Sequence, residues 1–245
     1  MDGVLADMEA ELVRRAEALF GRSMSRRTAE RPAAPGPGAA GDTPPDATPS
    51  SQPAAESAPD NVPPLPRLNM TPRQQKKLWQ HVESIENFWQ TLDETEPGIV
   101  ARLAAIAGDR RWEVIFLTKR PESAGATAQL QSQRWLEAKG FTLPSVYVVQ
   151  GSRGRIAAAL GLDIVIDDRP ENCLDVVVDS RARAILVWRD DEKQLPAAAG
   201  RLGIGVVRSV GECLDLLTQE AADRQRTGVV GRVKRLLGLN EPARA

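Results

Sequence analysis

Two groups of polar residues follow short apolar runs and carry side chains that could do chemistry. Asp167 and Asp168 come directly after residues 164–166, and Thr118, Lys119 and Arg120 come directly after residues 112–117. Two adjacent carboxylates at the end of a buried strand are costly unless they bind a cation or accept several hydrogen bonds. Mg²⁺ suits such a pair, because it prefers oxygen ligands and keeps bound water and phosphate.

A simpler interpretation stays open for each group taken alone. An Asp-Asp pair after a strand can cap the next helix, and a Thr-Lys-Arg sequence can be a solvated loop. Both groups are predicted at strand ends of one sheet, however, and ligands of open parallel sheets bind beyond the carboxyl ends of the strands. The combination therefore favours a site over two unrelated loops.

The elements that would position these residues alternate along the second half of the chain. Apolar runs typical of short buried strands alternate with segments whose apolar residues recur at helical spacing. Such alternation predicts an α/β fold, with a doubly wound parallel sheet covered by helices on both faces. The predicted strands are residues 112–117, 146–149, 164–166, 184–188 and 205–208, and the predicted helices are 4–20, 71–92, 97–107, 123–139, 155–160, 171–175 and 211–219.

The composition changes along the chain and predicts five sections. Residues 1–26 begin the core with an amphipathic helix, and residues 27–66 hold most of the 18 prolines, so we expect a disordered insertion there. Residues 67–108 form a helical segment, and residues 109–222 form the α/β core. Residues 223–245 contain a short basic amphipathic helix, which we expect to dock on its own domain or to fray.

The bulk composition excludes several classes of protein. With 42% hydrophobic and 27% charged residues and a formal net charge of -1, the 245-residue chain reads as a globular protein without nucleic acid as a partner. Its two cysteines, Cys173 and Cys213, and its one histidine, His81, exclude a Cys/His zinc site and argue against a disulfide scaffold. The sequence shows neither a secretory signal nor a transmembrane run, so we expect a cytoplasmic location.

Three motifs, in order, resemble one family. MDGVLAD at residues 1–7, FLTKRP at residues 116–121 and IDDRPENC at residues 166–173 are similar to motifs of haloacid dehalogenase (HAD) superfamily phosphatases, most of all in the 5′(3′)-deoxyribonucleotidase-like branch. The resemblance implies a HAD-like Rossmannoid core and a small helical cap formed by residues 67–108. It also implies Mg²⁺-dependent hydrolysis of a small phosphorylated substrate, a nucleotide or similar phosphate ester, through an aspartyl-phosphate.

The resemblance also implies roles for residues of the first two motifs. Asp2 matches the second Asp of the family's Asp-x-Asp-Gly motif, which is the general acid and base and ligates Mg²⁺ through its backbone carbonyl. Thr118 matches the hydroxyl that hydrogen-bonds the transferring phosphoryl group. Lys119 and Arg120 are expected to add contacts to the substrate phosphate, with a solvated position as the alternative for either.

In the later motifs, Arg153 stands where the family has a lysine. Arg can neutralise phosphate charge, but its planar fork is not a copy of an ammonium group. Asp167 resembles the metal ligand, and Asp168 resembles a second carboxylate around the same ion. Asp7 is expected to complement the dipole of the first helix or to lie at the rim of the pocket.

Two hypotheses about function differ in whether the protein has a nucleophile. In the matching motif, Met1 occupies the place after the nucleophilic Asp, which would precede residue 1 together with the central strand that carries it. We expect a start assigned too far downstream rather than a degenerate protein, because loss of a central strand would exceed the stability of an ordinary domain. The first hypothesis is a Mg²⁺-dependent phosphatase, and the alternative is a non-catalytic phosphate-binding or scaffolding pseudo-phosphatase.

Overall fold

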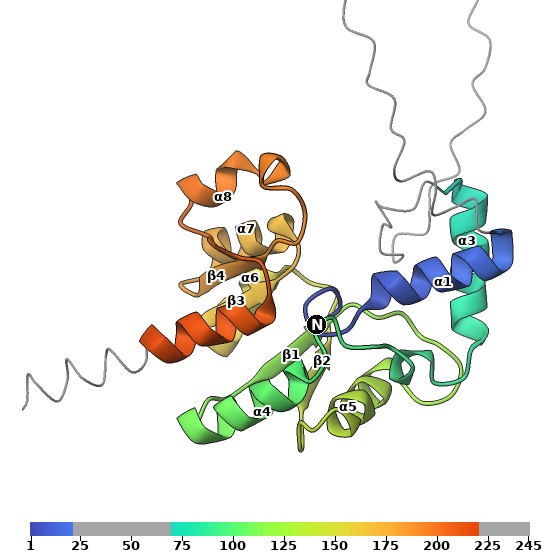
Figure 1. Ribbon diagram of the computed structural model, residues 1–245, viewed down its shortest axis with the longest axis horizontal. Coiled ribbons are helices and arrows are strands. Elements are labelled where there is room, and N and C mark those ends of the chain that lie inside the picture. The colour runs from blue at the N-terminus through green and yellow to red at the C-terminus, as the bar shows by residue number, and fades with distance from the viewer. Residues whose placement is uncertain (22–69, 221–245) are drawn as a thin grey trace, which may run out of the picture.

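Parallel strands alternate with helices in the part of the chain that the computed structural model describes, residues 1–21 and 70–220 (Figure 1). The fold is therefore α/β, as predicted. The predicted insertion at residues 27–66 and the predicted basic helix within residues 223–245 lie outside the described residues. Within the described ranges, no helix is both long enough and apolar enough to cross a bilayer.

The first sheet has two strands and begins the α/β part. Strand β1 (Ile115–Thr118) runs parallel to β2 (Ser145–Val148), with Ile115 opposite Ser145 and Thr118 opposite Val148. Helix α5 (Ala128–Ala138) makes the crossover between them and begins at Thr127, whose side chain accepts a hydrogen bond from the Leu130 amide. Helix α4 (Ile99–Arg110) precedes β1.

The second sheet has three strands in the order β3-β4-β5, all parallel. Its strands are β3 (Ile164–Asp167), β4 (Arg183–Val187) and β5 (Gly205–Val207). The connecting helices are α6 (Arg153–Leu160) before β3, α7 (Pro170–Asp179) between β3 and β4, and η2 (Glu192–Gln194) with α8 (Ala197–Arg201) between β4 and β5. A last helix covers residues 210–220.

Strand β4 shows why this sheet carries helices on both sides. Ala184 and Leu186 pack into one apolar cluster with residues of α6, α7 and α8, whereas Ile185 and Val187 pack into another with residues of the last helix. Alternate side chains of a strand point to opposite faces, so both faces of β4 are buried. Burial of both faces explains why residues 184–188, from which a buried strand was predicted, form a continuous apolar run.

The described strands do not form the single sheet that the sequence predicted. Hydrogen-bonded pairing joins β1 to β2 and joins β3, β4 and β5, but among the described strands none links β1 to β3. Figure 1 shows the N-terminus at the junction of the two sheets. A doubly wound single sheet is therefore not confirmed, and parallel α/β organisation in two sheets is what the structure has.

The N-terminal helix is shorter than predicted. Helix α1 (Met8–Phe20) begins after Asp7, whose Oδ1 accepts the Ala10 amide at 3.0 Å, so Asp7 is the N-cap of the helix. Residues 4–6 were expected to be helical, but they belong to a turn that packs Val4, Leu5 and Ala6 into the core.

The predicted helix over residues 71–92 divides into two pieces. Helix α3 (Pro72–Ser84) begins with a capping box between Thr71 and Gln74, and the short helix η1 (Phe88–Gln90) follows. Between them, the Asn87 amide donates to the Ala124 carbonyl at 2.7 Å and the Ala124 amide donates to the Glu83 carbonyl at 2.8 Å. These bonds to the loop after β1 replace helical bonds, although the predicted apolar stripe is buried at Leu78, Val82, Trp89 and Leu92 and partly buried at Ile85.

Candidate functional site

The N-terminal turn brings Asp2 to the carboxyl end of β1. The Leu5 amide donates to the Met1 carbonyl at 2.9 Å and closes the turn, while the Thr95 hydroxyl donates to the Val4 carbonyl at 2.6 Å. Gly3 has a φ of +72°, and a Cβ built there would lie 1.9 Å from Oδ2 of Asp168. Glycine is required at this position both for its backbone conformation and for the close approach of Asp168.

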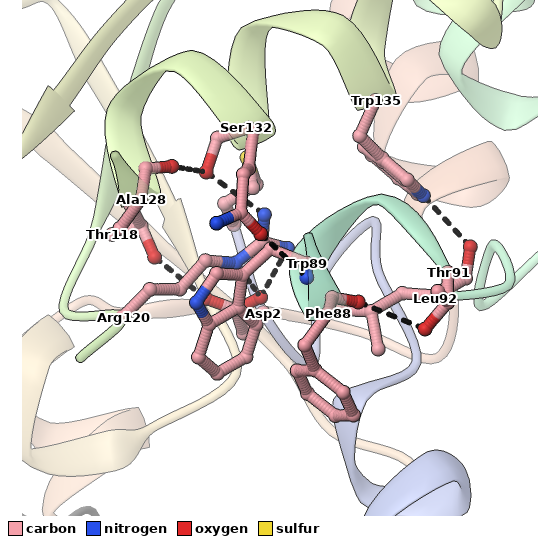
Figure 2. Close-up of polar contacts among 12 residues, drawn as sticks. Asp2, Phe88, Trp89, Thr91, Leu92, Thr118, Arg120, Ala128, Ser132 and Trp135 are labelled. Carbon is pink, nitrogen blue, oxygen red and sulfur yellow. Dashed lines mark hydrogen bonds and ion pairs between the residues drawn. The ribbon is translucent and has the colours of Figure 1, made fainter. Parts of the chain in front are cut away.

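Both carboxylate oxygens of Asp2 accept hydrogen bonds from residues at the end of β1 (Figure 2). Oδ2 accepts from the Thr118 hydroxyl at 2.6 Å, and Oδ1 accepts from Nε and Nη2 of Arg120 at 2.8 and 2.6 Å. The structure thus brings together three of the residues that the resemblance singled out.

The environment of Asp2 favours its ionised form. Burial alone would raise the pKa of Asp2, but the charges of Arg120 and of the terminal ammonium group, together with the hydrogen bonds from Arg120 and Thr118, outweigh burial and leave the pKa lowered. Asp2 is therefore a carboxylate at neutral pH.

Arg120 is a fixed part of the site rather than a free cation. Its side chain is fully buried, its Nη1 donates to the Ser132 hydroxyl at 2.9 Å, and its guanidinium carbon lies 5.1 Å from the centre of the Trp89 ring. The Arg120 guanidinium forms an ion pair with the carboxylate of Asp2, and its contact to a substrate phosphate stays a prediction. Lys119, which follows β1 directly and precedes Arg120, has an exposed side chain.

Asp167 orders the turn between β3 and α7. Its Oδ1 accepts from the Arg169 amide and from Nδ2 of Asn172, each at 2.9 Å. Neither donor is a backbone amide of α7 (Pro170–Asp179), so these bonds do not cap the helix, and Oδ2 of Asp167 lies 4.0 Å from Nε of Arg153. The motif IDDRPENC contained the signal for Asn172, which the sequence analysis did not use.

The charge of the Asp168 carboxylate is compensated only in part, by the terminal ammonium group, a backbone hydrogen bond and Arg169. Burial and the negative charge of neighbouring Asp167 raise the pKa of Asp168 to about 6. A divalent cation beside Asp167 and Asp168 would remove this repulsion, so the chemistry of this pair fits a hard metal ion such as Mg²⁺. Among residues 1–21 and 70–220, however, no three acidic, Cys or His side chains are gathered closely enough to hold a metal. That finding concerns side chains, whereas the resemblance implies a backbone carbonyl ligand from Asp2, so the ligand set of Asp2, Asp167 and Asp168 stays a prediction.

Arg153 is the first residue of α6, where it is buried with unsatisfied donors. Only 6% of the residue is exposed, and its Nε and Nη1 have no hydrogen-bond partner among the described residues. Burial lowers the pKa of Arg153, opposed by the charges of Asp167 and Asp2. Arg153 therefore lies where the third motif predicted it, facing the carboxylates at the end of β3.

A pocket of about 200 Å³ lies on the other side of Asp168. Arg189 holds one wall in place, since its guanidinium donates to the carbonyls of Gly3 and Val4 and forms an ion pair with Glu96 at 3.3 Å. The residues that line the pocket come from the N-terminal turn, the start of α1 and the end of β4: Gly3, Asp7, Glu9, Thr95, Asp168, Val187, Trp188, Arg189 and Asp190.

The residues after β4 were missed by the sequence analysis. Trp188, Arg189 and Asp190 follow a predicted strand, so the rule that selected residues 118–120 and 167–168 also applied to them. Asp7, which was expected at the helix or at the pocket rim, takes both positions, because it caps α1 and lines the pocket.

Comparison with known proteins gives no relatives for this site. No protein-family model, no curated protein and no solved structure matches the chain.

Proposed function

We propose that the carboxyl ends of β1 and β3 bind the phosphoryl group of a small phosphate ester together with Mg²⁺, in a phosphomonoester hydrolase of the HAD type. The observation that carries this proposal is the buried guanidinium of Arg153, whose Nε and Nη1 lack hydrogen-bond partners among the described residues. Buried unsatisfied donors on a charged group are costly, and an anion with several acceptor oxygens satisfies them.

The nearest carboxylate does not satisfy Arg153. Oδ2 of Asp167 lies 4.0 Å from Nε, which is beyond hydrogen-bond distance, and Oδ1 of Asp167 already accepts two hydrogen bonds. A phosphate group beside Arg153 would accept hydrogen bonds from the unsatisfied donors of Arg153. Its oxygens would also bind a metal ion held by Asp167 and Asp168. Mg²⁺ would supply neutralisation of the phosphate charge, and exposed Lys119 would add a further cation at the same edge.

In this proposal Asp2 is the group that moves a proton. It is ionised, and its carboxylate is oriented by Thr118 and Arg120. Hydrolysis by the route that the family resemblance implies needs in addition an aspartate directly before Met1, whose carboxylate would attack phosphorus and form the aspartyl-phosphate. The activity is therefore proposed for a chain that carries this residue.

The pocket beside Asp168 would receive the leaving group. The residues that line it include four acidic ones, Asp7, Glu9, Asp168 and Asp190, and one basic one, Arg189. A second phosphate would be repelled there, whereas a neutral hydroxyl-bearing group or an amine would not. We therefore propose monophosphates, nucleoside monophosphates among them, rather than diphosphates as substrates.

Phosphate binding tests the proposal in the chain as it stands. Thermal unfolding with inorganic phosphate and Mg²⁺ should show a higher Tm than with either alone, because a ligand that binds only the folded state stabilises it. Arg153→Met should abolish the shift. Arg155→Met is the matched control, since Arg155 lies one half-turn away on α6 with 85% of its side chain exposed, and it should leave the shift unchanged. Equal shifts in both variants would overturn the site.

A second experiment measures hydrolysis of substrate by an extended chain. A chain extended by an apolar run that ends in Asp should hydrolyse nucleoside monophosphates with Mg²⁺, and the same chain with Asn at that position should not. If phosphate binds but no extended form turns over substrate, the hydrolase is wrong.

A non-catalytic phosphate-binding protein is the second candidate. The observation that favours it is that three hydrogen bonds from Thr118 and Arg120 hold Asp2 in its ionised form, which disfavours the protonated form that a general acid needs. This candidate predicts the Arg153-dependent phosphate shift with no turnover in any extended form.

A further inference from the structure

Arg189 contacts the backbone of the turn that carries Asp2. Its Nη1 donates to the Gly3 carbonyl, and its Nη2 donates to the Val4 carbonyl. These hydrogen bonds are charge-assisted, so they are stronger than bonds between neutral groups. A side chain that follows β4 thus helps to hold a turn that lies at the ends of β1 and β3.

Gly3 lies directly against Asp168. A Cβ built on Gly3 would lie 1.9 Å from Oδ2 of Asp168, so the backbone of the turn approaches the end of β3 as closely as a glycine allows. Among the described residues, Arg189 is the donor from which the Gly3 carbonyl accepts a hydrogen bond. Arg189 therefore holds the part of the turn that sets the separation between the turn and Asp168.

Thr95 holds the following part of the turn. Its hydroxyl donates to the Val4 carbonyl at 2.6 Å, and its amide donates to the Leu5 carbonyl at 2.8 Å. Neither bond reaches Gly3, the residue that follows Asp2 directly. The backbone next to Asp2 therefore depends on Arg189 rather than on Thr95.

Glu96 orients the guanidinium of Arg189. Its Oε1 lies 3.3 Å from Nη2 of Arg189 and accepts the Val210 amide at 2.7 Å. Its Oε2 accepts the Gly211 amide at 2.9 Å, so the carboxylate is anchored on the start of the last helix. Because a guanidinium is a planar fork with fixed donor directions, this ion pair directs the remaining donors of Arg189 to the turn.

We propose that Arg189 is a positioning residue that fixes the backbone of Gly3 against Asp168, and that Glu96 orients it for this role. The effect on ligands rests on the proposed function, in which Asp168 helps to hold Mg²⁺ beside the phosphate. Arg189 acts there through the turn, without contact to phosphate or metal. Groups that orient the residues around a metal typically change metal affinity or activity by about 10–100-fold.

Amide hydrogen exchange tests whether Arg189 fixes the turn. The Gly3 amide donates to the Ala6 carbonyl at 2.9 Å. The Leu5 amide donates to the Met1 carbonyl at 2.9 Å, so both amides report opening of the turn. In Arg189→Met these amides should exchange at least about tenfold faster, because opening no longer breaks the hydrogen bonds of the guanidinium.

Arg102→Met is the matched control. The Arg102 side chain is 42% exposed, against 33% for Arg189, and it binds the same last helix through Asp215 and the Gly211 carbonyl. Among the described residues, no hydrogen bond joins Arg102 to the turn, so exchange of the turn amides should be unchanged in this variant. Equal acceleration in both variants, or none in Arg189→Met, would overturn the positioning role.

Titration calorimetry with inorganic phosphate in excess Mg²⁺ measures the effect on the proposed site, at a temperature at which every variant is folded. Arg189→Met should weaken phosphate binding about tenfold or more, whereas Arg102→Met should leave it unchanged. Arg189→Lys keeps the positive charge but lacks the planar fork that reaches both carbonyls, so its phosphate binding should remain weakened. Full affinity in Arg189→Lys would show that charge alone acts and would contradict positioning.

The two measurements separate this inference from the proposed function. Absence of Arg153-dependent phosphate binding in the original chain would overturn the proposed function. The exchange comparison needs neither phosphate nor Mg²⁺, so it would still decide whether Arg189 fixes the turn. Faster exchange together with unchanged phosphate affinity in Arg189→Met would refute a role of Arg189 in the site.

Discussion

The buried pair of Asp2 and Arg120 should be a main source of stability for the site. Arg120 has a fully buried side chain and Asp2 is 15% exposed, with two contacts of 2.6 and 2.8 Å between them. Removing one partner of a buried ion pair leaves an uncompensated charge and costs about 3–5 kcal/mol. For a domain of this size, in which 1 kcal/mol corresponds to about 2–4 °C, Arg120→Met should lower Tm by roughly 6–20 °C.

A double-mutant cycle isolates the pair. Asp2→Asn and Arg120→Met should each destabilise, whereas the double variant should be less destabilised than the sum of the two, with a coupling of about 2–3 kcal/mol. Urea unfolding monitored by circular dichroism gives the three free energies. The matched control is Arg183→Met, which removes a half-exposed arginine from its ion pair with Glu220 and should cost less than about 1 kcal/mol.

The pH dependence has a definite sign. Because the pKa of Asp2 is lowered in the folded state, its contribution is present above the ordinary value of 3.8 and is lost as pH falls through the folded pKa. The difference between the original chain and Asp2→Asn should therefore be constant from neutral pH to about pH 5 and shrink only below that. A cost of Arg120→Met no larger than that of Arg183→Met would refute the reasoning.

Three further predictions concern single groups. Burial and Asp167 raise the pKa of Asp168 from 3.8 to about 6, so the stability lost by ionising it is absent below pH 3.8 and greatest above pH 6. The gain in stability of Asp168→Asn over the original chain should therefore be small near pH 4 and rise to roughly 2–3 kcal/mol above pH 6 in urea titrations without Mg²⁺. Glu96 accepts the amides of Val210 and Gly211 at the start of the last helix, so Glu96→Gln should cost about 1–2 kcal/mol, against less than about 0.5 for exposed Glu113→Gln; equal costs would contradict the capping role. Cys173 and Cys213 are buried free thiols whose pKa burial raises to about 12, so a thiol reagent at pH 8 should modify neither before unfolding, and rapid labelling would show that the packing is wrong.

The parallel α/β organisation could be predicted because short buried strands and amphipathic helices leave different periodicities. All five predicted strands are present, with boundaries shifted by up to three residues. The long helix over residues 71–92 was wrong because its apolar stripe is continuous, whereas the backbone breaks at Asn87, which has a φ of +52° and bonds Ala124. A tertiary hydrogen bond of this kind leaves no periodic signal.

The candidate site was predictable as a set of strand ends but not as a network. Thr118 and Asp167 are the last residues of β1 and β3, and Arg153 is the first residue of α6, so their positions follow from the bounds of these elements. The ion pair of Arg120 with Asp2 depends on contacts of Arg120 with Ser132 and Trp89. These two residues lie on other elements and contact Arg120 only in the folded chain, so the sequence did not reveal the pair. Sequence adjacency to Lys119 suggested a shared role, yet one side chain points inward and the next outward, as alternation along an extended backbone requires.

The contacts of Trp89 join η1 to the loop after β1 that carries Arg120. The Trp89 amide donates to Oε1 of Gln131 at 3.0 Å, and the indole Nε1 donates to the Pro121 carbonyl at 3.0 Å. The Trp89 ring lies over the guanidinium of Arg120. These contacts fix the position of η1. Movement of η1 away from the core would therefore displace the loop that carries Arg120 and separate Arg120 from Asp2. The helical segment of residues 67–108 stays a predicted cap, but at η1 its contacts support the pair of Asp2 and Arg120, so variation at Trp89 should lower the stability of that pair.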